Sequence, residues 1–148
     1  MSKNPKQAQE HVLQKQRERK LKQYINSHLS KAANIAFSQN GMVYFTELGA
    51  EETVKKMRLD LFSEPEIFAS LPEWISPVDN TEPRAEGLRV DDRGRVLIAE
   101  SGTGKLLRMT PDARKLEVLA DSYDGYRFTT VKDLAIGQGD DLFVSSPF

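Results

Sequence analysis

The sequence contains no cysteine, only two histidines and a single tryptophan among its 148 residues. Without cysteine, a disulfide framework, a thiolate nucleophile and a cysteine-ligated metal centre are all excluded. The histidines, His11 and His28, lie seventeen residues apart with no obvious nucleophile beside them, so they do not indicate a metal site or a catalytic pair. A chain free of cysteine fits a reducing compartment, and we expect a cytoplasmic location.

Long hydrophobic runs are also missing. The longest apolar runs have four or five residues, whereas a membrane-spanning helix needs roughly 20, and the N-terminus has no apolar signal-peptide core. The chain is 39% hydrophobic and 29% charged, with a net charge of −1. This composition predicts one soluble domain that is large enough to bury a core.

A fourteen-residue pattern is present three times, and each copy has the form strand, polar turn, strand. The copies are residues 34–47 (NIAFSQNGMVYFTE), 87–100 (GLRVDDRGRVLIAE) and 133–146 (DLAIGQGDDLFVSS), whose starts lie 53 and 46 residues apart. Such a period is typical of repeat proteins in which each unit buries its apolar faces against its neighbours.

The similarity continues beyond this strand pair, because residues 55–59 align with 105–109 and residues 66–69 with 117–120. Four short strands per repeat correspond to a blade of a β-propeller. The expected fold is therefore mainly β with an N-terminal α-helix: a partial β-propeller of about two and a half four-stranded blades. The blades are residues 33–72, 84–122 and an incomplete 128–148. Because propellers typically close with four to eight blades, we expect that these residues cannot complete a ring.

The second strand of each repeat is predicted to be buried on both faces, since residues 42–45 and 96–99 are continuous apolar runs. The turns before them contain Gly41 and Gly94, residues that tolerate the positive φ of a tight connection between paired strands.

The N-terminal arm, residues 1–32, has a net charge of +6, and residues 33–148 have a net charge of −7. Residues 5–29 contain no internal glycine or proline and predict a helix. Its apolar positions are Val12, Leu13, Leu21, Tyr24, Ile25 and Leu29. Three interpretations stay open: the arm packs on its own acidic propeller or is solvated, it docks on another protein, or it binds nucleic acid or anionic lipid. We regard nucleic acid as the weaker possibility, because no aromatic stacking set accompanies the basic residues.

Candidate partner-binding residues follow from this pattern. On the arm they are Arg17, Arg19, Lys20, Leu21, Tyr24 and Ile25. Trp74, in the segment between the first two blades, either caps the core or anchors a partner.

Residues 85–148 carry a family resemblance. Gly87-Leu88-Arg89-Val90-Asp91 is similar to the inner-strand motif G-L-A-V-D, and residues 128–134 (FTTVKDL) are similar to F-x-x-P-N-D-L. The chain thus resembles the six-bladed propellers of the SMP-30/gluconolactonase/LRE-like superfamily, with its strictosidine-synthase-like relatives, over residues 33–148, about half of such a propeller.

The resemblance implies a divalent cation, calcium or zinc, in the central channel of a complete propeller, where it assists hydrolysis of a lactone or ester. The glutamate ligand of the first blade would align near Ala33, with Asn34 beside it, and the asparagine ligand aligns with Lys132. Alanine offers no ligand and an ammonium repels a cation, so no metal ligand is assigned. Asp133 matches the residue that follows that asparagine.

Ala33, Glu86 and Lys132 are equivalent in three consecutive repeats, each just before an inner strand, so we expect all three at the channel mouth. Glu86, Lys132 and Asp133 are the candidate ligand-binding residues. Glu86 and Lys132 form either an ordinary ion pair or a site in which the lysine replaces the metal electrostatically and binds an anion. Glu47 and Glu100 end equivalent second strands, but nothing in the sequence brings a catalytic carboxylate pair together.

Two functions remain open. The first is a non-catalytic interaction or assembly module that binds a partner protein, or a second copy, through the helical arm and the open blade edge. The alternative is a fragment of a metal-dependent, gluconolactonase-like hydrolase of a small lactone or ester. Whether the protein is an enzyme is not decided by the sequence.

Overall fold

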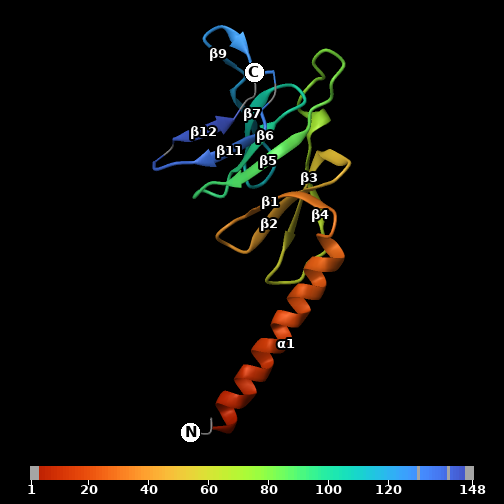
Figure 1. The fold of residues 1–148 in the computed structure, drawn as a ribbon, viewed down its shortest axis with the longest axis vertical. Helices are drawn as coiled ribbons and strands as arrows, with labels where there is room; N and C mark the ends of the chain where they lie inside the picture. Colours follow the sequence, from red (N-terminus) through yellow and green to blue (C-terminus); the bar gives the residue numbers. More distant parts are fainter. Residues whose placement is uncertain (1–3, 130, 140, 146–148) are drawn as a thin grey trace. The chain divides into compact units, whose positions relative to one another are not determined.

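The computed structural model describes residues 4–129, 131–139 and 141–145, and it consists of one N-terminal helix followed by short antiparallel strands (Figure 1). It divides into two compact units, residues 1–31 and 32–148. Among the described residues, no helix is both long and apolar enough to span a membrane. Thr130, Asp140 and residues 146–148 of the third predicted blade lie outside the described residues.

The first unit is the helix α1 (Pro5–His28). The side chain of Asn4 caps its N-terminus by accepting a hydrogen bond from the Gln7 N–H at 2.8 Å, and Pro5 occupies the first turn, where no N–H is needed. At the other end the Leu29 N–H donates to the Ile25 carbonyl at 2.7 Å. The predicted N-terminal helix is confirmed.

The second unit contains two complete antiparallel blades. The first is formed by β1 (Ala32–Phe37), β2 (Met42–Glu47), β3 (Ala50–Arg58) and β4 (Glu66–Ser70), paired in sequence order. The second is formed in the same way by β5 (Ala85–Val90), β6 (Val96–Glu100), β7 (Lys105–Met109) and β8 (Leu116–Ala120). The predicted mainly β, blade-like fold is confirmed.

Further elements lie in the connections and in the third repeat. A 3-10 helix η1 (Leu71–Glu73) follows the first blade, and a small hairpin of β9 (Ser122–Tyr123) and β10 (Tyr126–Arg127) follows the second. The third repeat contributes the antiparallel pair β11 (Asp133–Ile136) and β12 (Leu142–Ser145).

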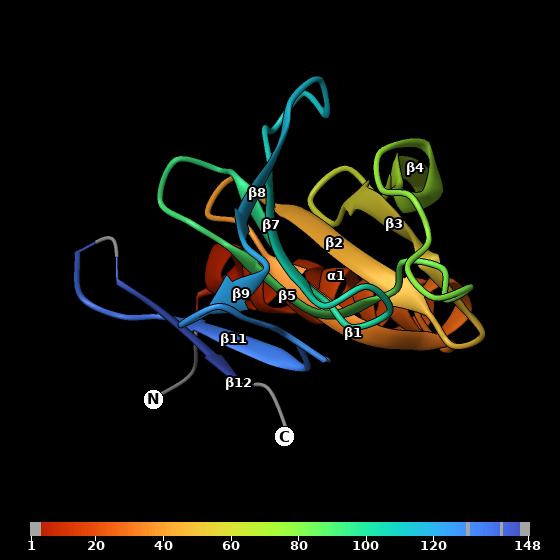
Figure 2. The ribbon, with the colours of Figure 1, turned by 90° about the horizontal axis from the view of Figure 1, so that it is seen from above.

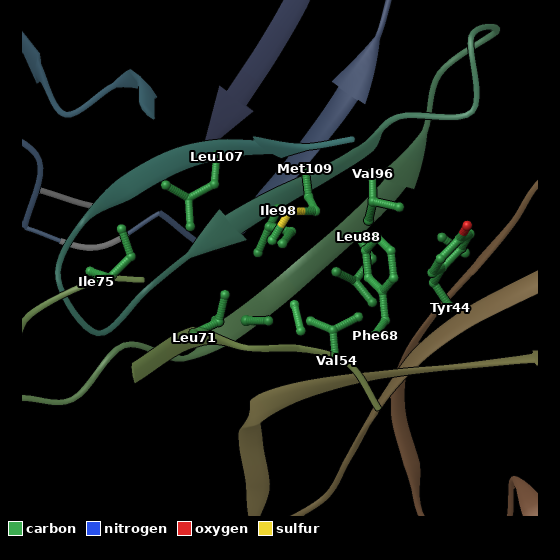
Figure 3. Close-up of a cluster of buried hydrophobic side chains, with 13 residues drawn as sticks. Tyr44, Val54, Phe68, Leu71, Ile75, Leu88, Val96, Ile98, Leu107 and Met109 are labelled. Carbon is green, nitrogen blue, oxygen red and sulfur yellow. The ribbon is translucent and has the colours of Figure 1, made fainter. Parts of the chain in front are cut away.

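The main hydrophobic core lies between the two complete blades (Figure 3). Tyr44, Val54 and Phe68 of the first blade pack with Leu88 and Ile98 of the second, and the Tyr44 and Phe68 rings meet edge to face at 4.9 Å. A second cluster lies between β6 and the third repeat and contains Leu97, Ala99, Leu106, Val131 and Leu134. Because neighbouring residues of β6 belong to different clusters, this strand is buried on both faces, as the sequence predicts.

The hairpin turns have the predicted chemistry. Gly41 and Gly94 take equivalent positions in the first two repeats, with φ of 86° and 77°. An L-residue with a side chain rarely adopts this left-handed conformation, which explains why glycine stands there.

Candidate functional site

The inner strands of both complete blades have an irregularity at the same place. The register of β1 with β2 shifts between Ala32 and Asn34, and that of β5 with β6 shifts between Ala85 and Gly87. Ala33 and Glu86 are therefore the extra residues of two equivalent bulges. A bulge turns a side chain away from the regular alternation of a strand. The backbone therefore gives the side chains at positions 33 and 86 an equivalent, irregular placement in their blades.

Lys132 takes the corresponding place in the third repeat, directly before β11, and its N–H donates to the Ser145 carbonyl at 3.0 Å. Figure 2 shows β5 between β1 and β11, so the three inner strands are neighbours. Their beginnings border one hollow of about 310 Å³, lined by Ala33, Asn34, Ile35, Glu86, Gly87, Leu88, Arg89, Lys132 and Asp133. The structure thus brings together the three positions that the repeat makes equivalent. Ala33 and Lys132 are exposed and Glu86 is half-buried.

Gly87 sets how closely the second and third inner strands approach. A Cβ atom at this position would lie 3.1 Å from the Asp133 Cα and 3.1 Å from the Lys132 carbonyl oxygen. Such a contact is tighter than backbone atoms normally allow. The absence of a side chain at Gly87 therefore allows Lys132 and Asp133 to lie close beside β5.

Asp133 is held by its surroundings. Its Oδ1 lies 3.7 Å from Arg89 Nη2 and accepts a hydrogen bond from the Leu134 N–H at 2.8 Å. Arg89 also donates through Nη1 to the Leu88 carbonyl at 2.8 Å. This exposed ion pair connects β5 to β11 and contributes little net stability by itself, but it neutralises one carboxylate of the hollow.

Glu86 and Lys132 are arranged differently from the ion pair that we considered. Within the described parts of the chain, no ion pair of 4.0 Å or less joins them, and neither side chain forms another hydrogen bond or ion pair. A carboxylate and an ammonium thus line the same hollow, each available to a ligand.

Asn34 completes the polar lining on the first blade. Its Nδ2 donates to Thr46 Oγ1 at 3.0 Å and to the Ala85 carbonyl at 3.4 Å, which links the first blade to the second. Both bonds use the amide nitrogen, so the side-chain carbonyl oxygen is left as an acceptor.

Glu100 has a structural task that the sequence did not reveal. Its side chain is fully buried and accepts hydrogen bonds from the Arg84 N–H at 2.8 Å, the Thr103 N–H at 3.0 Å and the Thr103 hydroxyl at 2.5 Å. It thereby ties the segment before β5 to the β6–β7 turn. The sequence feature that could have indicated this role is a glutamate at the end of an apolar strand, followed by the turn residues Ser-Gly-Thr-Gly. The equivalent Glu47 instead pairs with Lys55.

The hollow does not fit a divalent cation by itself. Among the described residues, no three or more His, Asp or Glu side chains gather in a way that could hold a metal ion. The hollow offers the carboxylates of Glu86 and Asp133 together with the positive charges of Arg89 and Lys132. Cations beside the donor oxygens oppose the binding of Ca²⁺ or Zn²⁺.

The candidate partner-binding residues differ in their exposure. Arg17, Arg19 and Lys20 are exposed on α1, Tyr24 and Ile25 are half-buried, and the side chain of Leu21 lies outside the described residues. Trp74 is 41% exposed, because Leu71 and Ile75 on either side of it supply the core contacts. Trp74 therefore does not cap the core, and partner binding by these residues stays a prediction.

Comparison with known proteins identifies similar propellers. No protein-family model matches the chain. A gluconolactonase of Zymomonas mobilis subsp. mobilis is 30% identical over 66 residues, which are 45% of this chain and 18% of that protein. The chain thus spans about a fifth of the curated relative it matches.

Solved structures give the same architecture. A gluconolactonase of Xanthomonas campestris matches with a TM-score of 0.62 at 17% identity, over 78% of this chain and 35% of that one. The calcium-binding protein regucalcin of Agrobacterium tumefaciens matches with a TM-score of 0.52 at 20% identity, over 78% of this chain and 37% of that one. At these identities the likeness establishes the propeller fold and leaves the activity to be argued from the site.

Proposed function

We propose that this chain, which forms part of an SMP-30/gluconolactonase-like β-propeller, carries the reacting groups of a hydrolase that opens a lactone or a related ester. The observation that supports the proposal is the presence of Glu86 and Lys132 on one hollow, a carboxylate and an ammonium that do not neutralise each other. The two similar gluconolactonases favour a lactone as the substrate class.

In this proposal Glu86 is the general base. Its carboxylate takes a proton from a water molecule, and the water oxygen forms a bond to the carbonyl carbon of the lactone. The carbonyl π electrons move to the oxygen, where Lys132 donates a hydrogen bond to the negative charge that develops.

Collapse of this intermediate restores the carbonyl and breaks the bond between that carbon and the ring oxygen. The leaving oxygen takes the proton from the Glu86 carboxyl, which returns to the carboxylate, and the product is an open-chain hydroxy acid. The Arg89–Asp133 pair beside them connects β5 to β11 and neutralises the second carboxylate of the hollow, so that Glu86 is left as the base.

The test measures lactone hydrolysis by the Glu86→Gln and Lys132→Met variants. The rate is monitored as the release of acid at constant pH. We expect each substitution to lower kcat by about 100-fold or more, because each removes a group that acts in the transition state. Glu52→Gln and Lys115→Met are matched controls on exposed residues away from the hollow, and they should retain activity. Full activity in either test variant, or no lactone opening by the unaltered protein, contradicts the proposal.

A second candidate function, binding of another polypeptide, has one observation in its favour. Phe143 of β12 is 63% exposed, whereas Tyr44 and Leu97, the equivalent residues of the first two repeats, are 4% and 2% exposed. The next repeat covers those two residues. The surface that suits Phe143 is therefore the apolar face of a further blade.

A further inference from the structure

Two arginine side chains share another hollow of the propeller unit, which we call the arginine hollow. It has a volume of about 220 Å³ and lies between the β5–β6 turn and the connection from β11 to β12. Figure 1 shows β5 and β11 running toward the same side of the unit. The lining of the arginine hollow includes Asp91, Asp92, Arg95, Arg108, Gly137 and Gly139.

The arginine hollow is separate from the hollow of the candidate hydrolase site. In the second blade Ala85 at the start of β5 pairs with Glu100, whereas Val90 at the end of β5 pairs with Val96. The candidate site lies at the start of β5 and the arginine hollow at its end, and the two linings have no residue in common. An inference about the arginine hollow therefore does not depend on the proposed lactone hydrolysis.

Each arginine is held by one carboxylate and keeps donors for a ligand. Arg95 Nε pairs with Asp91 Oδ2 at 2.7 Å, and Arg108 Nη2 pairs with Glu117 Oε2 at 2.8 Å. Within the part of the chain that the structure describes, both Nη atoms of Arg95 are without a partner, as are Nη1 and the buried Nε of Arg108. Two oriented guanidinium groups with unused N–H donors thus line one space.

The carboxylates beside these arginines are already engaged. Asp91 accepts three hydrogen bonds within its own turn. The hydrogen bond from Arg108 is the main cause of a lowered pKa of Glu117, and the positive charges of Lys115 and Arg95 lower this pKa further. Arg95 therefore lies near enough to act on the carboxylate that holds Arg108, which indicates that the two guanidinium groups are neighbours.

The first repeat has different side chains at the equivalent positions. Met42 corresponds to Arg95, and Lys56 corresponds to Arg108, since each of the last two pairs with a glutamate of the outer strand. Met42 packs against the main hydrophobic core, and Lys56 Nζ lies 5.8 Å from the centre of the Phe68 ring. The blade architecture thus does not require an arginine at either position, and the pair of arginines is a feature of the second repeat.

We propose that the arginine hollow binds a compact tetrahedral oxyanion, either inorganic phosphate or the phosphate group of a small monoester. A guanidinium group donates N–H bonds in a planar fork that matches the oxygen atoms of a phosphate, and such charge-assisted bonds are stronger than neutral ones. Because Asp91 and Glu117 hold the two arginines in advance, little side-chain freedom is lost on binding. Gly137 and Gly139 bring no side chain to the hollow, which leaves room for the anion.

The experiment is calorimetric titration of the whole chain with inorganic phosphate and with glycerol 3-phosphate at constant ionic strength. Arg95→Met and Arg108→Lys introduce the residues of the first repeat. Each should weaken binding about tenfold or more, because each removes charge-assisted hydrogen bonds to the anion. Tighter binding of glycerol 3-phosphate identifies a monoester as the ligand, and tighter binding of inorganic phosphate identifies the free anion.

Two variants on the same turn are controls. Arg93→Met removes a positive charge from an exposed residue outside the lining and should change the affinity less than about twofold. Asp92→Asn removes an exposed negative charge from the lining and should strengthen binding about threefold. This gain cannot result from a damaged fold, so the test holds even if an arginine variant unfolds.

Three results would overturn the oxyanion site. They are no binding of either probe by the unaltered protein, unchanged affinity in Arg95→Met and Arg108→Lys, and a loss in Arg93→Met as large as that in Arg95→Met. The last result would show only a general attraction of anions by surface arginines. Lactone hydrolysis, measured separately, is unaffected by any of them.

Discussion

At the scale of single residues, Asp91 shows how a carboxylate stabilises a blade turn. It accepts hydrogen bonds from the N–H groups of Arg93 and Arg95, at 3.0 Å and 2.8 Å, and pairs with Arg95 Nε at 2.7 Å. Burial opposes ionisation, but the hydrogen bonds from Arg95 and Arg93 outweigh it and lower the pKa of Asp91. In the first repeat the equivalent residue, Ser38, stabilises the turn in the same way. Its hydroxyl oxygen accepts a hydrogen bond from the Met42 N–H at 3.0 Å.

The lowered pKa predicts how stability depends on pH. A carboxyl that is more acidic in the folded than in the unfolded state stabilises the fold above its unfolded pKa, about 3.9, and loses this effect as pH falls through the folded value. Asp91→Asn should therefore cost about 2 kcal/mol at pH 7 and progressively less below pH 4.

Urea unfolding at pH 7 and below pH 4 measures the free energy that Asp91→Asn costs under each condition. Asp92→Asn, on the exposed neighbour in the same turn, is the matched control and should change stability little. A cost for Asp91→Asn that stays constant down to pH 2 would contradict the role assigned to the charged carboxylate.

Residues that act locally could be predicted, and residues that act at a distance could not. Gly41 and Gly94 indicate their turns because the conformation and the residue that tolerates it lie together in the sequence. For Glu100 only its local partner Thr103 could be read from the sequence, because its other partner, Arg84, lies sixteen positions earlier and approaches only when β5 pairs with β6. The placement of Glu86 and Lys132 on one hollow was accessible because the repeat relates them, but whether they form an ion pair depends on side-chain geometry.

At the scale of elements, β6 joins the two hydrophobic clusters. Leu97 packs with Leu134 in the cluster next to the third repeat, and Ile98 packs with Leu88 in the cluster between the first two blades. Both side chains are almost completely buried, at 2% and 0% exposure. One strand therefore couples the three repeats.

Shortening a buried side chain of β6 should destabilise the whole propeller unit. Ile98→Ala is expected to lower the free energy of unfolding by about 3 kcal/mol, since it removes buried methyl groups and leaves a cavity. Val118→Ala on the nearby β8, where Val118 is 48% exposed, should cost less than about 1 kcal/mol. Denaturant titration compares the two, and equal costs would rule out β6 as the central buried strand.

The blades were predictable as elements, and the β9–β10 hairpin was missed. Blade strands repeat about every 50 residues, so each copy supports the assignment of the others. The hairpin has strands of two residues each, too short for any apolar alternation. Its only local indication was Asp124-Gly125 between two tyrosines, a favoured hairpin turn.

At the scale of the whole molecule, charge separates the two units. The arm, residues 1–32, carries +6 and the remainder carries −7. The basic side chains of Arg17, Arg19 and Lys20 are exposed. Under the partner-binding function, such an arm attracts an acidic protein surface, and the attraction weakens as salt increases.

Deletion of residues 1–30 tests whether the basic arm binds a partner. We expect the truncated chain to lose association with its partner while keeping its strands folded, because the blades and their two clusters contain none of residues 1–30. Native mass measurement reports association and circular dichroism reports the strands. Complexes of unchanged size after the deletion would remove the arm from partner binding.

The repeated bulge at the inner strands has a consequence for how such a protein can change. The bulges at positions 33 and 86 are features of the strand register and do not depend on the side chain. The residue at each position can therefore be exchanged without disturbing the sheet. Alanine, glutamate and lysine already occupy the three equivalent positions of this one chain. The first two repeats thus present a replaceable side chain on the same backbone frame, and under the proposed function a lineage can change the specificity of this hollow by single substitutions.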